Sequence, residues 1–150
     1  GYNRYEISNY AKEGYHCKHN VAYWKREDYI GIGIGAASLL EGRRLKNITD
    51  INEYIMKEST PCSCLDIEET QTLTKEDMMA EFMFLGLRMV EGVSVRKFKE
   101  EFGENFNTIY GGITKKHIKD GLLEENGENI RLTELGMDVS NVVMSSYILC

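Results

Sequence analysis

The stretch that decides the fold is residues 122–135, LLEENGENIRLTEL. Two apolar runs, residues 122–123 and 130–132, flank the pair Asn126-Gly127. Asn-Gly between apolar runs is typical of a β-hairpin, because both loop positions need positive φ. Thr133 follows at once, and its hydroxyl can accept a hydrogen bond from the first turn of a helix. The stretch therefore predicts a hairpin that leads into a helix.

Three helices are predicted before this hairpin. Thr74 is the expected N-cap of the first, whose apolar residues recur every three or four positions until Gly92. Ser94 is expected to cap the second, which ends at Gly103, and the third spans about 107–120. The expected inward residues are Met78, Met79, Phe82, Met83, Leu87, Phe98, Phe102, Ile109, Ile113 and Ile118, with Val139, Val142, Val143 and Ile148 in a closing helix. Three helices, a hairpin and a closing helix predict a winged-helix-like domain over residues 75–150.

The part before this domain differs in composition. Residues 56–74 are polar and acidic, contain the sole proline and predict a linker. Residues 1–55 are rich in glycine and aromatics, with expected buried strands at 4–8 and 29–34 and a turn at Glu41-Gly42. Buried parallel strands need neighbours on both sides. We therefore expect this segment to belong to a larger sheet whose other strands lie upstream of Gly1.

Composition excludes some classes of protein. Hydrophobic residues make up 42% and charged residues 28%, as in globular proteins, and no apolar run approaches the roughly 20 residues of a membrane span. The net charge is −6, and residues 75–150 carry most of the excess acid, which argues against binding a phosphate backbone.

The chain has four cysteines: Cys17, Cys62, Cys64 and Cys150. Their spacing is not that of a zinc site. Four cysteines without a pattern favour a reducing, cytoplasmic location.

Several motifs follow one another along the chain. They are YEISNYA at 5–11, HNVAYW at 19–24, an aspartate leading into GIGIGAAS at 31–38, LGLR at 85–88 and IRLTELG at 130–136. In this order and spacing they resemble the oxygen-independent coproporphyrinogen III oxidase family of radical-SAM proteins. HNxxYW marks the heme-chaperone, HemW-like branch of that family, so the resemblance favours this branch.

The resemblance implies an α+β fold: the C-terminal strands of a radical-SAM partial (β/α) barrel, followed by the family's winged-helix-like C-terminal domain. It also implies that the protein binds heme for delivery to target proteins, with His19 as heme ligand and Asn20, Tyr23 and Trp24 completing the motif. Neutral imidazole is a good iron ligand, and aromatic rings pack on a flat macrocycle. His16 is a competing ligand, His117 is expected on a polar helix face, and the propionate partners would be Lys18, Lys25 and Arg26.

The resemblance also places Gly35, Ala36 and Ala37 at the edge of an S-adenosylmethionine site. Ile34 and Ala37 stand where many relatives carry Pro and His. The family's [4Fe–4S] cluster is held by a CxxxCxxC run, which this sequence lacks. We therefore expect no catalytic residue, no cluster and no radical chemistry in this chain alone, with cluster and S-adenosylmethionine belonging to the full-length protein.

Other interpretations stay open. The chain is alternatively part of a coproporphyrinogen III oxidase or dehydrogenase of porphyrin biosynthesis, which HNxxYW disfavours. A winged-helix nucleic-acid module would use Lys115, Lys116, His117 and Lys119, but acidic residues at 120, 124, 125 and 128 would repel a phosphate. The remaining alternative for residues 75–150 is packing over the open end of a barrel. We expect heme or porphyrin as partner, with no nucleic acid and no membrane span.

Overall fold

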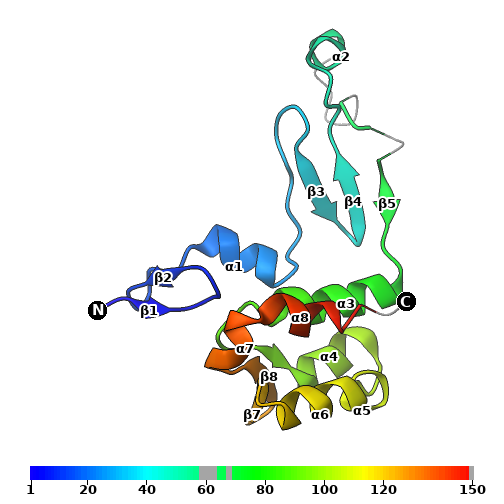
Figure 1. Cartoon of the computed structure of the whole chain (residues 1–150). Coiled ribbons are helices and arrows are strands. Elements are labelled where there is room, and N and C mark those ends of the chain that lie inside the picture. The colour runs from blue at the N-terminus through cyan, green and yellow to red at the C-terminus, as the bar shows by residue number, and fades with distance from the viewer. Residues whose placement is uncertain (58–63, 67–68, 149–150) are drawn as a thin grey trace. The chain divides into compact units, whose positions relative to one another are not determined.

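A computed structural model gives the structure of the chain (Figure 1) and describes residues 1–57, 64–66 and 69–148. The chain forms two compact units: Gly1–Arg26 together with Lys75–Cys150, and Glu27–Thr74. The predicted division into 1–55, 56–74 and 75–150 stays a prediction, and the compact units share its boundary after Thr74. Within the described ranges, no helix is both long and apolar enough to cross a bilayer.

The C-terminal part of the first unit follows the predicted order of helices and hairpin, but the single predicted closing helix is two helices, Glu134–Asp138 and Ser140–Ser145. Its elements are α3 (Lys75–Gly86), β6 (Val93–Ser94), α4 (Val95–Phe102), α5 (Phe106–Ile109), α6 (Gly111–Lys119), β7 (Leu123–Asn126), β8 (Asn129–Leu132), α7 (Glu134–Asp138) and α8 (Ser140–Ser145). Figure 1 shows α3 and α8 side by side, with α4, α5 and α6 below them. This mixture of helices and antiparallel strands confirms the α+β class.

Three predicted helix ends are confirmed. The Ser94 hydroxyl accepts a hydrogen bond from the Lys97 amide at 3.3 Å and so caps α4. Gly103 ends the same helix with φ of 70°, a left-handed conformation that glycine adopts without a steric penalty. The Thr133 hydroxyl accepts from the Gly136 amide at 3.0 Å and caps α7.

The hairpin forms, but its loop lies one residue later than predicted. Asn126 pairs with Asn129 at the end of the β7–β8 ladder, so the two loop residues are Gly127 and Glu128. Gly127 has φ of 63°, and Glu128 does not have positive φ. Such a loop needs glycine only at its first position, and Asn126 is therefore free to stay in the strand. β6 pairs with β8, which gives the strand order β6-β8-β7.

The core of this part is an aromatic cluster centred on Phe98. The Phe98 side chain is fully buried and makes ring contacts with centroid distances between 5.0 and 5.8 Å. Its ring partners are Phe82, Phe102, Phe106 and Tyr110. Edge-to-face pairs of this kind add to the free energy of area burial and fix the relative orientation of α3, α4 and α5.

The predicted helix over 107–120 is wrong, because the chain breaks at Tyr110 into α5 and α6. The predicted inward isoleucines, Ile109, Ile113 and Ile118, are partly buried and pack against the core, but the fully buried positions are others. Tyr110, Thr114 and His117, spaced three to four residues apart, point inward, and Thr114 and Tyr147 hydroxyls lie 2.9 Å apart. His117, predicted on a polar face, is buried with its Nε2 2.8 Å from the Ser146 hydroxyl. Burial of Thr114 and His117 is possible here because Tyr147 and Ser146, directly after α8, supply hydrogen-bonding partners.

The N-terminal part of the first unit contains β1 (Asn3–Arg4), β2 (Tyr10–Ala11) and α1 (Lys18–Trp24). The predicted buried strand over 4–8 is mostly replaced by backbone contacts with the turn after α3. The Ile7 amide donates to the Arg88 carbonyl at 3.0 Å, and the Val90 amide donates to the Tyr5 carbonyl at 3.1 Å. The YEISN and LGLR motifs, far apart in sequence, therefore lie together.

The second unit is a three-stranded antiparallel sheet of β3 (Ala37–Leu40), β4 (Arg43–Lys46) and β5 (Gln71–Thr72), with α2 (Ile51–Met56). The predicted turn Glu41-Gly42 is confirmed, with φ of 48° and 73°. β5 lies within the predicted linker, whose Pro61 and Cys62 fall outside the described residues.

The predicted buried strand over 29–34 is wrong beyond Tyr29, which pairs with Leu39. Ile32 is 93% exposed, and residues 30–34 form a loop. Gly33 and Gly35 have φ of 105° and 65°, outside the range of strand backbone. The alternating glycines therefore permit a turning loop and do not line one face of a strand.

Candidate functional site

The histidine motif lies on α1, a short helix at the surface of the first unit (Figure 1). The helix carries the sequence KHNVAYW, and none of its residues is fully buried. A helix of seven residues is unstable by itself in water, so side-chain packing must hold it in place. The contacts of α1 therefore determine where the motif residues lie.

His19 and Tyr23 form one face of the motif. Their ring centroids are 4.7 Å apart and their planes meet at 77°, an edge-to-face contact between residues four apart on the helix. The His19 ring is exposed, and its nitrogens make no hydrogen bond to any residue that the structure describes. An imidazole lone pair is therefore available to an external metal.

Trp24 lies at the packed end of the motif. The guanidinium of Arg88 lies 4.2 Å from the centroid of its ring, and Trp24 also packs on the buried cluster of Tyr5, Ala11 and Met89. The Trp24 Nε1 is buried and has no hydrogen-bond partner in the described part of the chain. Trp24 therefore joins the motif to the rest of the unit, while Asn20, half-buried, precedes it by one turn.

A buried carboxylate supports Arg88. Glu6 is 0% exposed, and one of its oxygens accepts from the Ser8 amide at 2.8 Å and from the Asn9 side-chain amide at 2.7 Å. Its other oxygen lies 3.4 Å from Nη2 of Arg88. Buried carboxylates are retained when hydrogen bonds and an opposite charge compensate their desolvation. Sequence reasoning quoted both residues within motifs but missed their contact, because no local pattern links them.

The predicted propionate partners differ in availability. Arg26 is used inside the unit, since it pairs with Glu81 at 3.4 Å and with Glu101 at 2.7 Å, and only 8% of its side chain is exposed. Lys25 pairs with Glu91 at 3.6 Å. Lys18 is exposed and forms no ion pair with any described residue. Of the three, only Lys18 therefore has an uncommitted charge, and the structure disfavours Arg26 as a propionate partner without testing it.

His16, the competing ligand, stacks on Tyr5. The ring centroids are 4.6 Å apart and the planes are within 11° of parallel. Tyr5 is buried, so this stack covers one face of an otherwise exposed imidazole. The two histidines therefore differ: His16 packs against the body of the unit, and His19 lies on the helix.

The predicted S-adenosylmethionine edge belongs to the second unit. The Gly35 amide donates to the Ile48 carbonyl at 2.9 Å, and the Ala36 carbonyl accepts from the Asn47 amide at 2.8 Å. The Asn47 side chain donates to the Gly33 carbonyl at 2.8 Å. Buried Asn47 therefore fixes the loop, and Ala37 begins β3 directly after it.

This loop borders a pocket of about 640 Å³ within the second unit. Most of its lining is apolar, and the polar groups are few. The lining residues include Ile30, Gly31, Gly33, Leu45, Asn47, Tyr54 and Leu65. Gly35, Ala36 and Ala37 do not line it.

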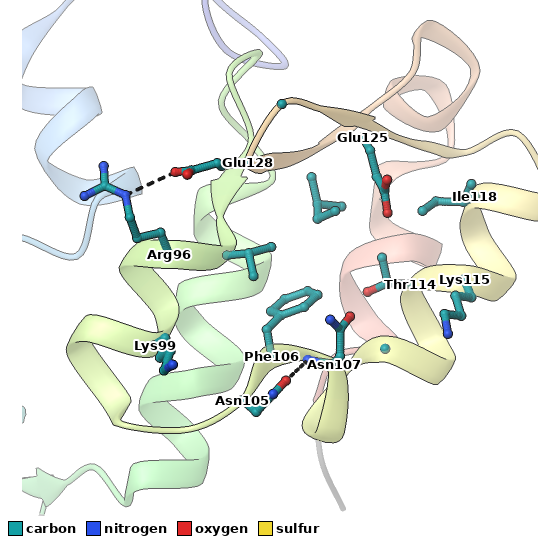
Figure 2. Close-up of a pocket in the computed structure, with 14 residues that line it drawn as sticks. Arg96, Lys99, Asn105, Phe106, Asn107, Thr114, Lys115, Ile118, Glu125 and Glu128 are labelled. Atoms are coloured by element: carbon teal, nitrogen blue, oxygen red, sulfur yellow. Dashed lines mark hydrogen bonds and ion pairs between the residues drawn. The ribbon is translucent and has the colours of Figure 1, made fainter.

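A second pocket, of about 510 Å³, lies between α4, α5, α6 and the hairpin (Figure 2). Figure 2 shows Lys115 on α6 and Glu125 on the hairpin at its border. Glu128 also borders it and pairs with Arg96 at 3.1 Å. The lining thus carries charges of both signs, with Lys99 as a further cation.

Cysteine and metal chemistry is limited in the described residues. Cys17 is an exposed thiol, Cys64 is partly buried, and Cys62 and Cys150 lie outside the described ranges. No group of three His, Cys, Asp or Glu side chains in those ranges is placed to hold a metal ion. The described residues therefore do not fit an iron–sulfur cluster, which needs thiolates.

Comparison with known proteins bears on these sites. The HemN C-terminal domain family matches residues 73–139. The chain is 38% identical to the heme chaperone HemW of Lactococcus lactis subsp. lactis (strain IL1403) and 33% identical to that of Bacillus subtilis (strain 168). Each alignment covers 99% of this chain and 38% of the relative, so the chain spans less than half the length of these relatives.

A solved structure shares the fold. It is the coproporphyrinogen III oxidase HemN from Escherichia coli, described as a radical SAM enzyme, and it matches with a TM-score of 0.74. The match covers 99% of this chain and 37% of that one at 14% identity, which shows the fold and nothing further. The predicted resemblance is confirmed: the chain has the fold of HemN, it is similar over 99% of its length to heme chaperones named HemW, and its residues 73–139 belong to the HemN C-terminal domain family.

Proposed function

We propose that this chain provides the heme-contacting part of a protein that binds heme and delivers it to target proteins. The observation that carries the proposal is the exposed His19 on α1, whose ring nitrogens have no partner among the described residues and whose ring packs against Tyr23. An iron atom at the surface of a carrier needs such a ligand, oriented yet accessible. The names of the HemW relatives support the same function.

Each motif residue has a proposed role. His19 donates a nitrogen lone pair to the heme iron, and Tyr23 restricts rotation of the imidazole. Asn20 and Trp24 complete the contact surface, with the half-buried Trp24 anchoring α1. Lys18, the uncommitted cation beside His19, pairs with a heme propionate. A ligand from a short, exposed helix can release heme to a recipient, because little protein structure must open.

The full-length protein is proposed to carry a [4Fe–4S] cluster and S-adenosylmethionine, with Gly35, Ala36 and Ala37 at the edge of the latter. In this chain, the fixed backbone of the glycine loop supports that placement, since Asn47 holds it rigid. The cluster would supply redox chemistry, which no described residue here provides. The exposed free thiol of Cys17 fits a reducing compartment, and we propose the cytoplasm.

A hemin titration tests the proposal. Hemin is added to the full-length protein and to its His19→Ala and His16→Ala variants, and the Soret band is followed. We expect His19→Ala to lose the histidine-ligated Soret signature and to bind hemin at least about tenfold more weakly. The matched variant His16→Ala should stay within about twofold, because it removes a nearby imidazole from a surface stack. Equal binding by His19→Ala and the unmodified protein would refute the proposal.

A further inference from the structure

The two ends of α1 are held differently. At its C-terminal end, Trp24 contacts Arg88, and Arg26, two residues on, pairs with Glu81 of α3. At its N-terminal end, Cys17 provides no side-chain cap and Lys18 and His19 are exposed. The orientation of the exposed end therefore depends on contacts made at the other end.

We infer that Arg88, in the turn after α3, is a positioning residue for heme binding: it fixes Trp24 and thereby sets the orientation of α1 and of His19. The inference rests on the proposed function and adds to it a residue of the C-terminal domain that lies outside the histidine motif. Arg88 acts through Trp24 and needs no contact with heme.

The geometry explains how Arg88 can do this. Its guanidinium lies 4.2 Å from the Trp24 ring centroid, a distance at which a cation is attracted to the face of an indole. The same guanidinium is held by Glu6, whose carboxylate is itself fixed by Ser8 and Asn9. A charge fixed on one side by a buried carboxylate leaves the indole few alternative positions.

The backbone reinforces this contact. The Arg88 carbonyl accepts a hydrogen bond from the Ile7 amide at 3.0 Å, so the segment that carries Glu6 is bound to the turn that carries Arg88. Both the Trp24 Nε1 and the Arg88 Nε are buried without a partner in the described part of the chain. Unsatisfied buried polar atoms cost stability, so stability alone does not account for an arginine at this position.

The test uses the full-length protein with Arg88→Ala, Arg88→Lys and, as matched control, Arg131→Ala. Arg131 is also a half-buried arginine of this unit in an ion pair, at 2.7 Å from Glu124, but it does not contact α1. We expect Arg88→Ala to weaken hemin affinity about tenfold, as when an orienting residue of a metal site is removed. At saturating hemin its Soret band should shift toward that of His19→Ala. Arg88→Lys should restore part of the affinity, and Arg131→Ala should stay within about twofold.

Two further measurements separate positioning from general stability. Trp24 is the sole tryptophan of this chain. Subtracting the fluorescence of the matching Trp24→Leu variant from that of the protein with Trp24 gives the difference emission, which is the emission of Trp24 itself. Arg88→Ala should change this difference emission, and Arg131→Ala should not. In the Trp24→Leu background, Arg88→Ala should have little further effect on hemin affinity, because the contact through which it acts is gone.

Three results would overturn the inference: unchanged hemin affinity in Arg88→Ala, equal losses in Arg88→Ala and Arg131→Ala, or additive effects of Arg88→Ala and Trp24→Leu. A different result marks failure of the proposed function. If the unmodified protein binds no hemin through His19, heme binding at α1 is refuted and the inference falls with it. His19-dependent binding that survives in Arg88→Ala refutes the inference and leaves the proposed function standing.

Discussion

Glu6 and Arg88 form an ion pair across 82 residues of sequence, with the carboxylate oxygen 3.4 Å from the guanidinium nitrogen. The carboxylate is fully buried, and the arginine side chain is 25% exposed. This pair joins the YEISN segment to the C-terminal domain, and Arg88 extends the connection to Trp24 of α1. A charge pair between two sequence motifs thus links the histidine helix to the domain that follows it.

Replacing Glu6 by Gln should therefore destabilise the first unit. The amide keeps the shape of the side chain but loses the negative charge that faces Arg88 and accepts from Ser8 and Asn9. We expect a loss of about 2 kcal/mol, in the range for hydrogen bonds to a charged group, measured by urea unfolding of the 150-residue chain. Glu134→Gln is the control. The Glu134 side chain, which pairs with Arg4, is 90% exposed, so the loss of this pair should change the free energy of unfolding little. Equal urea midpoints for both variants would contradict a structural role for the buried pair.

Two glycines with the same backbone angle give a matched pair of substitutions. Gly92 and Gly103 both have φ of 70°, so alanine at either should cost about 1 to 2 kcal/mol for the left-handed conformation. A Cβ at Gly92 would also collide with the Ile130 carbonyl and with Arg131, whereas a Cβ at Gly103 meets open space. Gly92→Ala should therefore be clearly more destabilising than Gly103→Ala in thermal unfolding. If both midpoints fell equally, the close approach of Gly92 to β8 would be wrong.

Acid should destabilise the first unit through His117. Burial, aided by Lys116, lowers the pKa of His117 below its ordinary value, although Asp120 opposes the shift. Below about pH 6.5, His117 binds a proton more readily in the unfolded chain than in the folded chain. The free energy of unfolding should therefore fall as the pH drops through that value. Urea midpoints on either side of it should show this decrease.

A His117→Gln variant serves to assign that pH dependence. It removes the titrating group, so its midpoint should depend less on pH over the same interval, while His16→Gln, at an exposed position, should behave like the unmodified chain. An unchanged slope in His117→Gln would assign the acid sensitivity to other groups.

Alkali should distinguish two buried tyrosines from the exposed ones. Burial raises the pKa of both Tyr110 and Tyr147 to about 12, and the hydrogen bond from Thr114 partly offsets the shift at Tyr147. Both folded-state pKa values are raised, so the neutral forms are favoured and stability is lost as the pH rises from about 10 toward 12. Absorbance at the phenolate band should therefore show a late rise near pH 12 from this pair. Tyr147→Phe should reduce that late rise, and its absence in the unmodified chain would count against burial of this pair.

Local sequence determined the elements whose ends are fixed by their own residues. Ser94, Gly103 and Thr133 were predicted as helix ends and are found there, because capping needs only a side chain or a free φ within a few residues. The hairpin was predicted for the same reason, and its one-residue shift shows that ladder pairing of Asn126 outweighs the preference of an Asn-Gly loop.

Patterns that depend on distant partners were predicted less well. The glycine alternation at 31–35 suggested a strand, but hydrogen bonds from Asn47 and to Ser38 hold it as a loop. His117 was predicted on a polar helix face, yet Ser146, directly after α8, provides a partner that makes its burial possible. In each case the deciding hydrogen bond comes from a residue outside the local window.

For the candidate site, the sequence by itself determined that the proposed heme-binding side chains lie close together, since His19 to Trp24 fall within a single short helix. Only the tertiary structure decided which of them stay available. In the folded chain, Trp24 contacts Arg88. Arg26 forms ion pairs with Glu81 and Glu101. His19 and Lys18 remain exposed. The physical reason is that buried charges and aromatic faces need partners, and here those partners lie more than fifty residues away in sequence.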